Sequence, residues 1–583
     1  MEIIMQKIKL LIADELKRQI DTINPETGLS SADISLMLEY PPDRTLGDLA
    51  LPCFKFSKTL RRSPVQIAQT LSDGFNCEAV SECNAVNGYL NIFISDEYLA
   101  SKIVPEILDS GDDYGKSDIG KGKTVVLDYS SPNVAKPFHI GHLGTTVIGH
   151  SLKLLHEFAG YKCVGINYLG DWGTQFGKLI VAYRKWGSRE QIEKGGIDEL
   201  VKLYVRVNNE ISGNEAEGIA PNKELADEAR AEFHKMEIGD EENIAIWKWF
   251  VQISLDEYQK TYGQLGITFD SYKGESFYTD KMPAQVEKLR EMELLKIDDG
   301  ASIVDLEPYN MPPCLILKRD GSTLYPTRDI AAAVYRKNEY DFEKCIYVTS
   351  SQQILHFQQW FKVVELMGYD WYDKLVHIPY GTVSINGAKL ATRTGNVVLL
   401  KDLFATAIEK VSEIMEEKNP ALKGRTDIAE AVGVGAIVFH YLSNSRIKDM
   451  NFNMDDALDF NGNTGPYVQY TYARCCSILD KDNGNSSSIA ALKLTESTES
   501  ALVKTLSRFP EKVSDAIAQY EPSVITRYIL DVAADFNRFY HDCQILSATD
   551  PDIRATRIKL TEATKIVLGN AFSLICLKKT EKI

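Results

Sequence analysis

The 583-residue chain is predicted to be an α/β protein whose parallel-sheet core lies between an N-terminal α+β domain and a C-terminal all-helical domain. Three observations predict this arrangement. The length exceeds what one hydrophobic core supports, so roughly three to four domains are expected. Residues 125–166 follow a strand, helix, strand pattern, and from about residue 403 apolar residues recur at helical spacing with few β-branched runs.

Residues 1–112 are predicted to form the first domain. The stretch "MEIIMQKIKLLIADELKRQI" has apolar residues at helical spacing and lacks the continuous apolar region of a secretory signal, so an amphipathic helix is expected. Short strands such as "GYLNIFIS" follow, and the Gly/Asp-rich "DSGDDYG" ends the domain. This mixture of helices and strands indicates an α+β unit.

The core begins with "KTVVLDYSSPN", in which an apolar strand from Val125 to Tyr129 precedes a turn. A helical pattern starts at about Gly141 and ends at Gly160, and "KCVGINYLGDWG" then supplies a second strand. Two strands joined by such a helix pair in parallel through a right-handed crossover. In Rossmann-type sheets of this kind, ligands bind beyond the carboxyl ends of the strands.

The core is predicted to span residues 113–402, with a helical insertion over about 188–256 that interrupts the sheet. The insertion is rich in charged, periodic segments, and an apolar strand resumes at Cys345 to Thr349. Residues 403–583 form the predicted helical domain.

Composition limits the function classes. No run of about 18 apolar residues could cross a bilayer, so a soluble protein without a membrane partner is expected. The ten cysteines include no C-x-x-C pair, which predicts neither a structural metal nor disulfides and favours a cytoplasmic location. A net charge of -17 argues against indiscriminate binding to nucleic acid, so any such partner would be met by local patches.

The stretch "NVAKPFHIGH" places His139 and His142 three residues apart at the start of the predicted core helix. A zinc site would need a third protein ligand, which the flanking sequence does not offer. Unpaired N–H groups at a helix N-terminus attract phosphate, and Gly141 lets the backbone approach a ligand closely. The two imidazoles are therefore predicted to stabilise charge on a phosphoryl or nucleotidyl group.

The strings around these histidines resemble those of the arginyl-tRNA synthetases, which are class I aminoacyl-tRNA synthetases with a HIGH motif. The resemblance rests on these segments: "SSPNVAKPFHIGHLGTTVIG", "GDWGTQFGKLI", "DGSTLYPTRDIAAAVYR", "SSQQILHFQQWF", "KLATRTGNVVLLKDL" and "GPYVQYTYARCCSIL". It covers essentially the whole chain. It implies ligation of L-arginine to tRNA(Arg) through an arginyl-adenylate, with ATP and Mg2+ as the substrate complex.

The resemblance also assigns site residues. His139, Gly141, His142 and Lys389 would bind ATP. Recognition of arginine requires a carboxylate that faces the planar guanidinium, and Tyr325 and Asp329 lie four apart at a predicted helix start. Spacing alone would favour an ordinary surface turn, but the family string supports a binding role. The complete implied arginine set is Asp128, Ser131, Asn133, Tyr325, Asp329 and Gln353. Asp171 is expected to line the same pocket or to cap a helix.

The sequence departs from the class pattern at two places. The second class I motif, KMSKS in general form, reads "KLATR", so Lys389 remains but Thr392 replaces the second lysine. In this family the lysine before HIGH is thought to substitute for it, which makes Lys136 a predicted catalytic residue beside His139, His142 and Lys389. The second departure is Gly144, where most relatives are expected to have arginine.

For tRNA, the helical tail resembles the anticodon-binding bundle of the arginyl, cysteinyl and methionyl enzymes. Tyr467, Tyr470 and Tyr472 alternate with Gln469 and Arg474, a mixture able to stack on splayed bases and hold phosphates. One or two of these tyrosines are expected to be exposed. In the first domain, "KFSKTLRRS" with Arg61 and Arg62 matches a unit that contacts the tRNA elbow, although its charges could equally form a solvated face.

Two other functions fit parts of the chain. A HIGH-type nucleotidyltransferase making a small nucleotidylated product would explain the first half but not the anticodon-like tail. A non-enzymatic tRNA-binding paralogue would explain the degenerate "KLATR" but not the intact residues of the site. A monomer is expected by analogy with the family.

Overall fold

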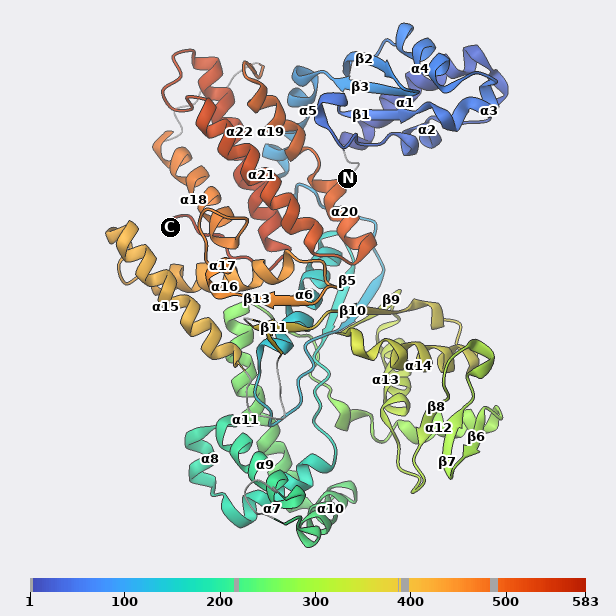
Figure 1. The fold of residues 1–583 in the computed structure, drawn as a ribbon, viewed down its shortest axis with the longest axis vertical. Helices are drawn as coiled ribbons and strands as arrows, with labels where there is room; N and C mark the ends of the chain where they lie inside the picture. The colour runs from blue at the N-terminus through green and yellow to red at the C-terminus, as the bar shows by residue number, and fades with distance from the viewer. Residues whose placement is uncertain (1–3, 214–219, 386, 390–397, 483–490) are drawn as a thin grey trace.

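The computed structural model describes residues 4–213, 220–385, 387–389, 398–482 and 491–583 (Figure 1). Its centre is a four-stranded parallel sheet in the order β10-β9-β4-β5. The chain adds β5 on one side of β4 and later adds β9 on the other, so the strand order reverses between β4 and β9. The predicted parallel-sheet core is confirmed. The strands are β4 (Thr124–Asp128), β5 (Lys162–Ile166), β9 (Lys344–Ser350) and β10 (Leu375–Tyr380).

The predicted strand-helix-strand unit is also confirmed. A short 3-10 turn (Ile140–His142) leads into α6 (Leu143–Phe158), which connects β4 to the parallel strand β5. Gly149 on α6 faces the end of β4, because a Cβ added there would lie 2.2 Å from Cβ of Tyr129. The missing side chain therefore allows the helix to pack closely on the strand that leads into the histidine segment.

The chain between β5 and β9 forms two insertions below and beside the sheet (Figure 1). The first is helical, and the second combines helices with an antiparallel sheet in the order β6-β7-β8. That sheet was not predicted, because its strands have only four residues each and show no clear alternation. The elements are α7 (Thr174–Trp186), α8 (Arg189–Gly195), α9 (Ile197–Ser212), α10 (Lys223–Glu237), α11 (Glu241–Leu265), α12 (Met282–Glu291), β6 (Leu295–Asp298), β7 (Ala301–Val304), β8 (Cys314–Leu317) and α13 (Tyr325–Tyr340).

Helix α11 runs from the first insertion back to the core and supports the loop between β4 and the histidines (Figure 1). The hydroxyl of Tyr258 donates to the carbonyl oxygens of Asn133 and Lys136, at 2.8 and 2.7 Å. The backbone N–H of Ala135 donates to Oγ of Ser254 at 3.0 Å. These bonds hold the loop in one conformation and thereby fix the positions of the site residues that it carries.

After α14 (Ile354–Leu366) and β10, the chain enters a second small sheet, in the order β12-β11-β13. Strand β13 (Met450–Phe452) comes from the helical tail and pairs in parallel with β11 (Val383–Ile385). β12 (Ala388–Lys389) pairs with β11 in turn. The segment that carries Lys389 is therefore attached to the C-terminal part of the chain.

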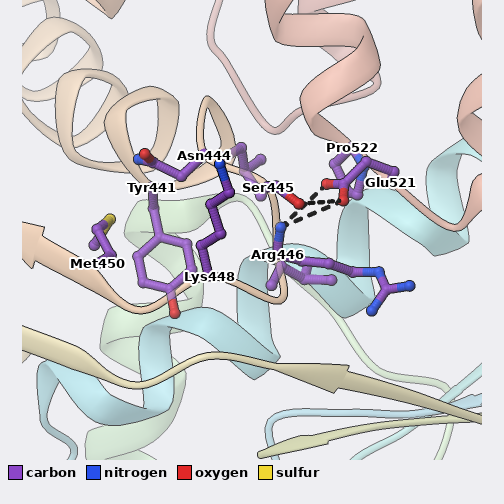
Figure 2. A pocket seen from close by; sticks show the side chains of 10 residues that line it. Tyr441, Asn444, Ser445, Arg446, Lys448, Met450, Glu521 and Pro522 are labelled. Carbon is purple, nitrogen blue, oxygen red and sulfur yellow. Dashed lines mark hydrogen bonds between the residues drawn. The ribbon is translucent and has the colours of Figure 1, made fainter. Parts of the chain in front are cut away.

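The C-terminal domain is a helical bundle, as predicted, apart from β13. Figure 2 shows the part of the bundle that meets the core, where Glu521 accepts hydrogen bonds from Ser445 and from the backbone N–H of Arg446 within the bundle itself. The Arg446 guanidinium donates to the carbonyl oxygen of Pro379 on β10, at 2.7 Å. The helices are α15 (Leu400–Lys418), α16 (Thr426–Leu442), α17 (Met454–Ala457), α18 (Gly465–Asp482), α19 (Ser497–Leu506), α20 (Phe509–Gln519), α21 (Ser523–Asp542) and α22 (Pro551–Ser573).

The N-terminal domain is an antiparallel sheet in the order β1-β3-β2 with packed helices. It lies against the bundle (Figure 1), where Lys9 pairs with Glu511 at 2.6 Å and Lys504 pairs with Asp96 at 2.9 Å. The proposed domain limits at residues 112 and 402 stay predictions. The elements are α1 (Ile4–Ile23), α2 (Ser31–Met37), β1 (Leu49–Pro52), α3 (Ser57–Leu60), α4 (Pro64–Asp73), β2 (Val80–Val86), β3 (Tyr89–Ile94) and α5 (Asp96–Ser110).

No helix in the described parts of the chain is long and apolar enough to span a membrane.

Close packing at Gly149 predicts the effect of one added methyl group. Gly149→Ala should lower the free energy of unfolding by roughly 1–3 kcal/mol, because the clash with Tyr129 outweighs the gain in helix propensity. Gly263→Ala is the matched control within α11: nothing lies within 4 Å of its added Cβ, so stability should rise by about 0.5–1 kcal/mol. Thermal unfolding of both variants tests this, and equal shifts would contradict it.

Candidate active site

A pocket of about 500 Å³ opens where β4 and β9 end, at the point where the strand order reverses. Its wall includes Asp128, the last residue of β4, and the end of β9 from Tyr347 to Ser350. The fold brings all six predicted arginine-binding residues to this pocket together with His142. They are Asp128, Ser131, Asn133, Tyr325, Asp329 and Gln353.

The two histidines cap the start of α6 with their own side chains. Nδ1 of His139 accepts the backbone N–H of Gly141 at 3.0 Å, and Nδ1 of His142 accepts the backbone N–H of His139 at 3.2 Å. An imidazole nitrogen that accepts a hydrogen bond carries no proton, so in the neutral ring the proton lies on Nε2. Both rings therefore present an Nε2–H donor.

Both imidazoles are neutral at ordinary pH. The pKa of His139 is lowered to about 4 and that of His142 to about 3, mainly by burial and with a smaller contribution from the positive charge of Lys136. The two ring centroids lie 3.9 Å apart, so a charge on one would also oppose a charge on the other. The pair therefore presents fixed N–H dipoles without a positive charge. None of the described residues form a group of three His, Cys, Asp or Glu suited to a metal ion.

Lys136 lies close enough to the histidines to affect both of their pKa values. It is half-buried under the first insertion, with Nζ 6.0 Å from the ring centroid of Tyr204, and burial lowers its own pKa. The backbone of Lys389 lies in β12, paired with Ser384. The predicted substitution at Thr392 lies outside the described residues.

Asp128 has an internal partner that the sequence did not reveal. Its carboxylate pairs with Nη2 of Arg336 at 2.8 Å and accepts the hydroxyl of Ser131 at 2.9 Å. Burial raises the pKa of Asp128, and the Arg336 charge opposes that shift. A direct contact between Asp128 and a substrate guanidinium stays a prediction. In the structure, this carboxylate forms an ion pair with Arg336 of the chain itself.

Tyr325 and Asp329 line the pocket from the start of α13. Nε2 of His356 lies 2.6 Å from a carboxylate oxygen of Asp329. Sequence analysis missed Glu275, which lines the pocket and pairs with Arg328 at 2.8 Å. Burial raises the pKa of Glu275 to about 7. In the sequence, Glu275 lies in "GESFY", a short string after the predicted helical insertion. This string has no periodicity that would have indicated a pocket residue.

Asp171 does not line the pocket. Its two carboxylate oxygens accept the backbone N–H and the hydroxyl of Ser276, at 2.8 and 2.7 Å. Asp171 does not cap the following helix either, because the N-cap of α7 is Gly173 and carries no side-chain hydrogen bond; Asp171 instead binds the 3-10 turn Glu275–Tyr278. Asp171 supports the segment that carries Glu275.

The structure explains why glycine stands at position 144. A Cβ added there would lie 2.2 Å from the Tyr441 hydroxyl oxygen and 3.1 Å from the ring of Tyr380. Tyr441 comes from α16 and lies in the part of the bundle shown in Figure 2. An arginine at position 144 would require Tyr441 to move, so the tyrosine ring occupies the space of the expected side chain.

The predicted tRNA-contacting tyrosines differ in exposure. Tyr470 is exposed, Tyr467 is partly buried and Tyr472 is buried. The prediction for Gln469 is wrong, because this residue is fully buried and donates to carbonyl oxygens inside the bundle. The Arg474 guanidinium lies 5.0 Å from the ring of Tyr470 and 4.7 Å from that of Tyr540, which sequence analysis missed. Arg61 and Arg62 are exposed.

Family models match three parts of the chain. Residues 103–454 match tRNA synthetases class I (R), catalytic domain; residues 468–583 match the DALR anticodon binding domain; and residues 6–94 match the arginyl tRNA synthetase N terminal domain. The catalytic model alone covers more than half of the chain. The fold and these matches define a class I aminoacyl-tRNA synthetase.

Whole-chain relatives narrow the assignment. The chain is 47% identical over 581 residues to "Arginine--tRNA ligase" of Alkaliphilus metalliredigens and equally so to that of Clostridioides difficile, covering 99% of this chain and 100% of each relative. Its fold is similar to arginyl-tRNA synthetases from Plasmodium falciparum (TM-score 0.80, 24% identity, full coverage of both chains) and Thermus thermophilus (0.79, 23%, covering 97% and 99%). The chain belongs to the arginyl-tRNA synthetase family, and the resemblance seen in its motifs is confirmed.

The buried neutral histidines predict a loss of stability in acid. Their folded pKa values, about 4 and about 3, lie below the ordinary 6.5, so between these values the unfolded chain binds protons that the folded chain does not. The free energy of unfolding should fall as the pH drops from about 6.5 towards about 4. Urea unfolding at several pH values measures this.

His142→Gln should reduce that acid-dependent loss, because it removes a group that the folded chain keeps unprotonated. His541→Gln, at an exposed side chain, is the matched control and should leave the pH dependence unchanged. A full wild-type loss in His142→Gln would show that this histidine does not carry it.

Proposed function

We propose that the pocket at the ends of β4 and β9 carries out ATP-dependent ligation of L-arginine to tRNA(Arg), with arginyl-adenylate as intermediate. The observation that carries this proposal is that six residues from three separate segments of the chain, all with the arginine-binding pattern of the family, line one pocket next to His142. Residues that served only in a surface turn or in core packing would have no reason to line the same pocket. The reaction releases pyrophosphate in the first step and AMP in the second.

Arginine would bind with its guanidinium at Asp329 and Tyr325. A planar guanidinium and a carboxylate form parallel charge-assisted hydrogen bonds, which a shorter or neutral side chain cannot match. Asn133, Ser131 and Gln353 would hold the α-amino and carboxylate groups, since they offer neutral donors and acceptors at the pocket wall. Asn133 packs closely on Gly170, where an added Cβ would lie 2.1 Å from its side-chain oxygen.

ATP would bind at the start of α6. The Nε2–H groups of His139 and His142 would donate to its phosphates, and Gly141 would allow the adenine to lie against the backbone. In activation, a carboxylate oxygen of arginine bonds to the α-phosphorus while the bond from that phosphorus to the bridging oxygen breaks, releasing pyrophosphate. Preorganised donors stabilise the charge that develops on the phosphates. Lys136 and Lys389 would supply positive charge to the departing pyrophosphate.

In the second step, a ribose hydroxyl of the 3'-terminal adenosine of the tRNA attacks the arginyl carbonyl carbon and AMP leaves. The helical bundle would hold the anticodon, with Tyr467, Tyr470 and Arg474 as contacts, and Arg61 and Arg62 would approach the tRNA elbow. Mg2+ would accompany ATP as part of the substrate. A cytoplasmic monomer remains the expectation for the chain.

Labelled amino acids test the substrate. Arginine should be attached to tRNA(Arg), whereas lysine, glutamine and citrulline should not. Asp329→Asn should raise KM for arginine by roughly 10²-fold or more, because it removes the charge opposite the guanidinium. Asp341→Asn, at an exposed position after the same helix, should leave KM unchanged. A small nucleotidylated product would favour a nucleotidyltransferase, and tRNA binding without charging would favour a non-enzymatic paralogue.

The role of Lys136 has its own test. Lys136→Ala should lower adenylate formation at least as much as Lys389→Ala, by roughly 10²-fold, since each removes one positive charge from the pyrophosphate side. Pyrophosphate exchange in the presence of tRNA measures this step. Lys185→Ala, an exposed lysine on α7, is the matched control and should exchange normally. Wild-type exchange by Lys136→Ala would refute the compensation for Thr392.

A further inference from the structure

A buried guanidinium of the chain itself lies in the pocket that is proposed to bind arginine. Arg336 on α13 is 1% exposed and lines the pocket. Its Nη2 pairs with Asp128 at 2.8 Å, and its Cζ lies 5.2 Å from the ring centroid of Tyr168 and 5.4 Å from that of Tyr347. A charge in this position acts on any second cation that enters the pocket.

Each carboxylate of the pocket has a different internal partner. Asp128 pairs with Arg336, and Glu275 pairs with Arg328. Asp329 has no arginine partner: its contact is with His356, whose Nε2 lies 2.6 Å from a carboxylate oxygen. Two of the three negative charges are therefore cancelled by arginines of the chain, and one remains for a ligand.

We propose that Arg336 is a specificity-determining positioning residue: it cancels the charge of Asp128, so that the pocket presents a single net negative charge to a side chain with a single positive charge. This inference rests on the proposed function, because it assumes that the pocket binds arginine. Arg336 acts through Asp128 and through the electrostatic balance of the pocket.

The surroundings of Arg336 support a role in charge balance. Within the described parts of the chain, none of the three guanidinium nitrogens of Arg336 meets the geometry of a hydrogen bond, so the guanidinium is held by charge interactions, among them the 2.8 Å ion pair with Asp128. The other groups that face it are the phenols of Tyr278 and Tyr347 and the thiol of Cys345, whose pKa values are all raised by burial, so they add no charge. Asp128 and Asp329 also interact electrostatically.

A buried ion pair contributes little stability relative to a neutral pair of similar volume, whereas a buried charge left alone is costly. Stability alone therefore does not account for the pair. Asp128→Asn would leave Arg336 unpaired and the pocket with no net charge, so the substrate guanidinium would meet a repelling cation. Replacing both partners by neutral residues would restore one net negative charge.

The decisive comparison is between Asp128→Asn and the double variant Asp128→Asn/Arg336→Gln. Arginine affinity by calorimetric titration, and KM and kcat for charging, are measured at about pH 8, where imidazole side chains are generally neutral. Asp128→Asn should weaken arginine binding by roughly 30-fold or more with a smaller effect on kcat. The double variant should bind arginine within about 3-fold of wild type, because the charge balance is restored.

A double variant that binds arginine as weakly as Asp128→Asn would overturn the inference and show that the Asp128 carboxylate contacts the substrate directly. Arginine binding unchanged in every variant, with only the melting temperature altered, would also overturn it, since the pair would then be purely structural. Arg336→Lys keeps the charge and should bind arginine nearly as wild type does. Asp128→Asn/Arg336→Met provides a second neutral pair if the amide pair does not fold.

Wild-type measurements separate this inference from the proposed function. If the wild type binds arginine but does not attach it to tRNA, the proposed function fails while the variant series still tests the charge balance by titration. If the wild type charges tRNA but the double variant does not recover arginine binding, only the inference fails.

Discussion

The site depends on one strained loop and on the helix that holds it. Between β4 and the histidines, Ser130, Ser131 and Ala135 adopt left-handed backbone conformations with φ of 70°, 47° and 57°. Such conformations cost roughly 1–3 kcal/mol for each non-glycine residue and persist only where the surroundings determine them. Hydrogen bonds with Tyr258 and Ser254 of α11 hold the loop around Ala135. The loop then places residues of the pocket on one side and Lys136 near the histidines.

Within this frame, the site works with fixed dipoles and balanced charges. The histidines are neutral because burial disfavours their protonated forms, and their Nδ1 atoms are occupied by backbone N–H groups. Donors that are already oriented need no reorganisation when charge develops on a phosphate. The Asp128 carboxylate follows a related principle, because the charge of Arg336 opposes the rise in its pKa that burial causes.

Local patterns predicted the parts of the fold in which neighbouring residues cooperate. The strand, helix, strand unit follows from periodicity and from Gly160, and the carboxyl ends of parallel strands must meet at one edge, so the pocket position follows as well. The β6-β7-β8 sheet was missed because four-residue strands carry almost no pattern. Gln469 was misjudged because a helical polar residue can face either solvent or the interior of a bundle, and only the packing of α18 on its neighbours decides.

By itself, the sequence determined the class of chemistry, through the histidine pair with Gly141, the Tyr325 and Asp329 pair at one helix start, and Lys136 as the counterpart of the lysine missing from "KLATR". These signals are local because each depends on residues within one turn or motif. Only the tertiary structure decided that Arg336 forms an ion pair with Asp128, that Tyr441 fills the space at Gly144, and that α11 supports the loop between β4 and the histidines. Such contacts join segments distant in the sequence, and their partners are selected by close packing and charge compensation in a shared interior.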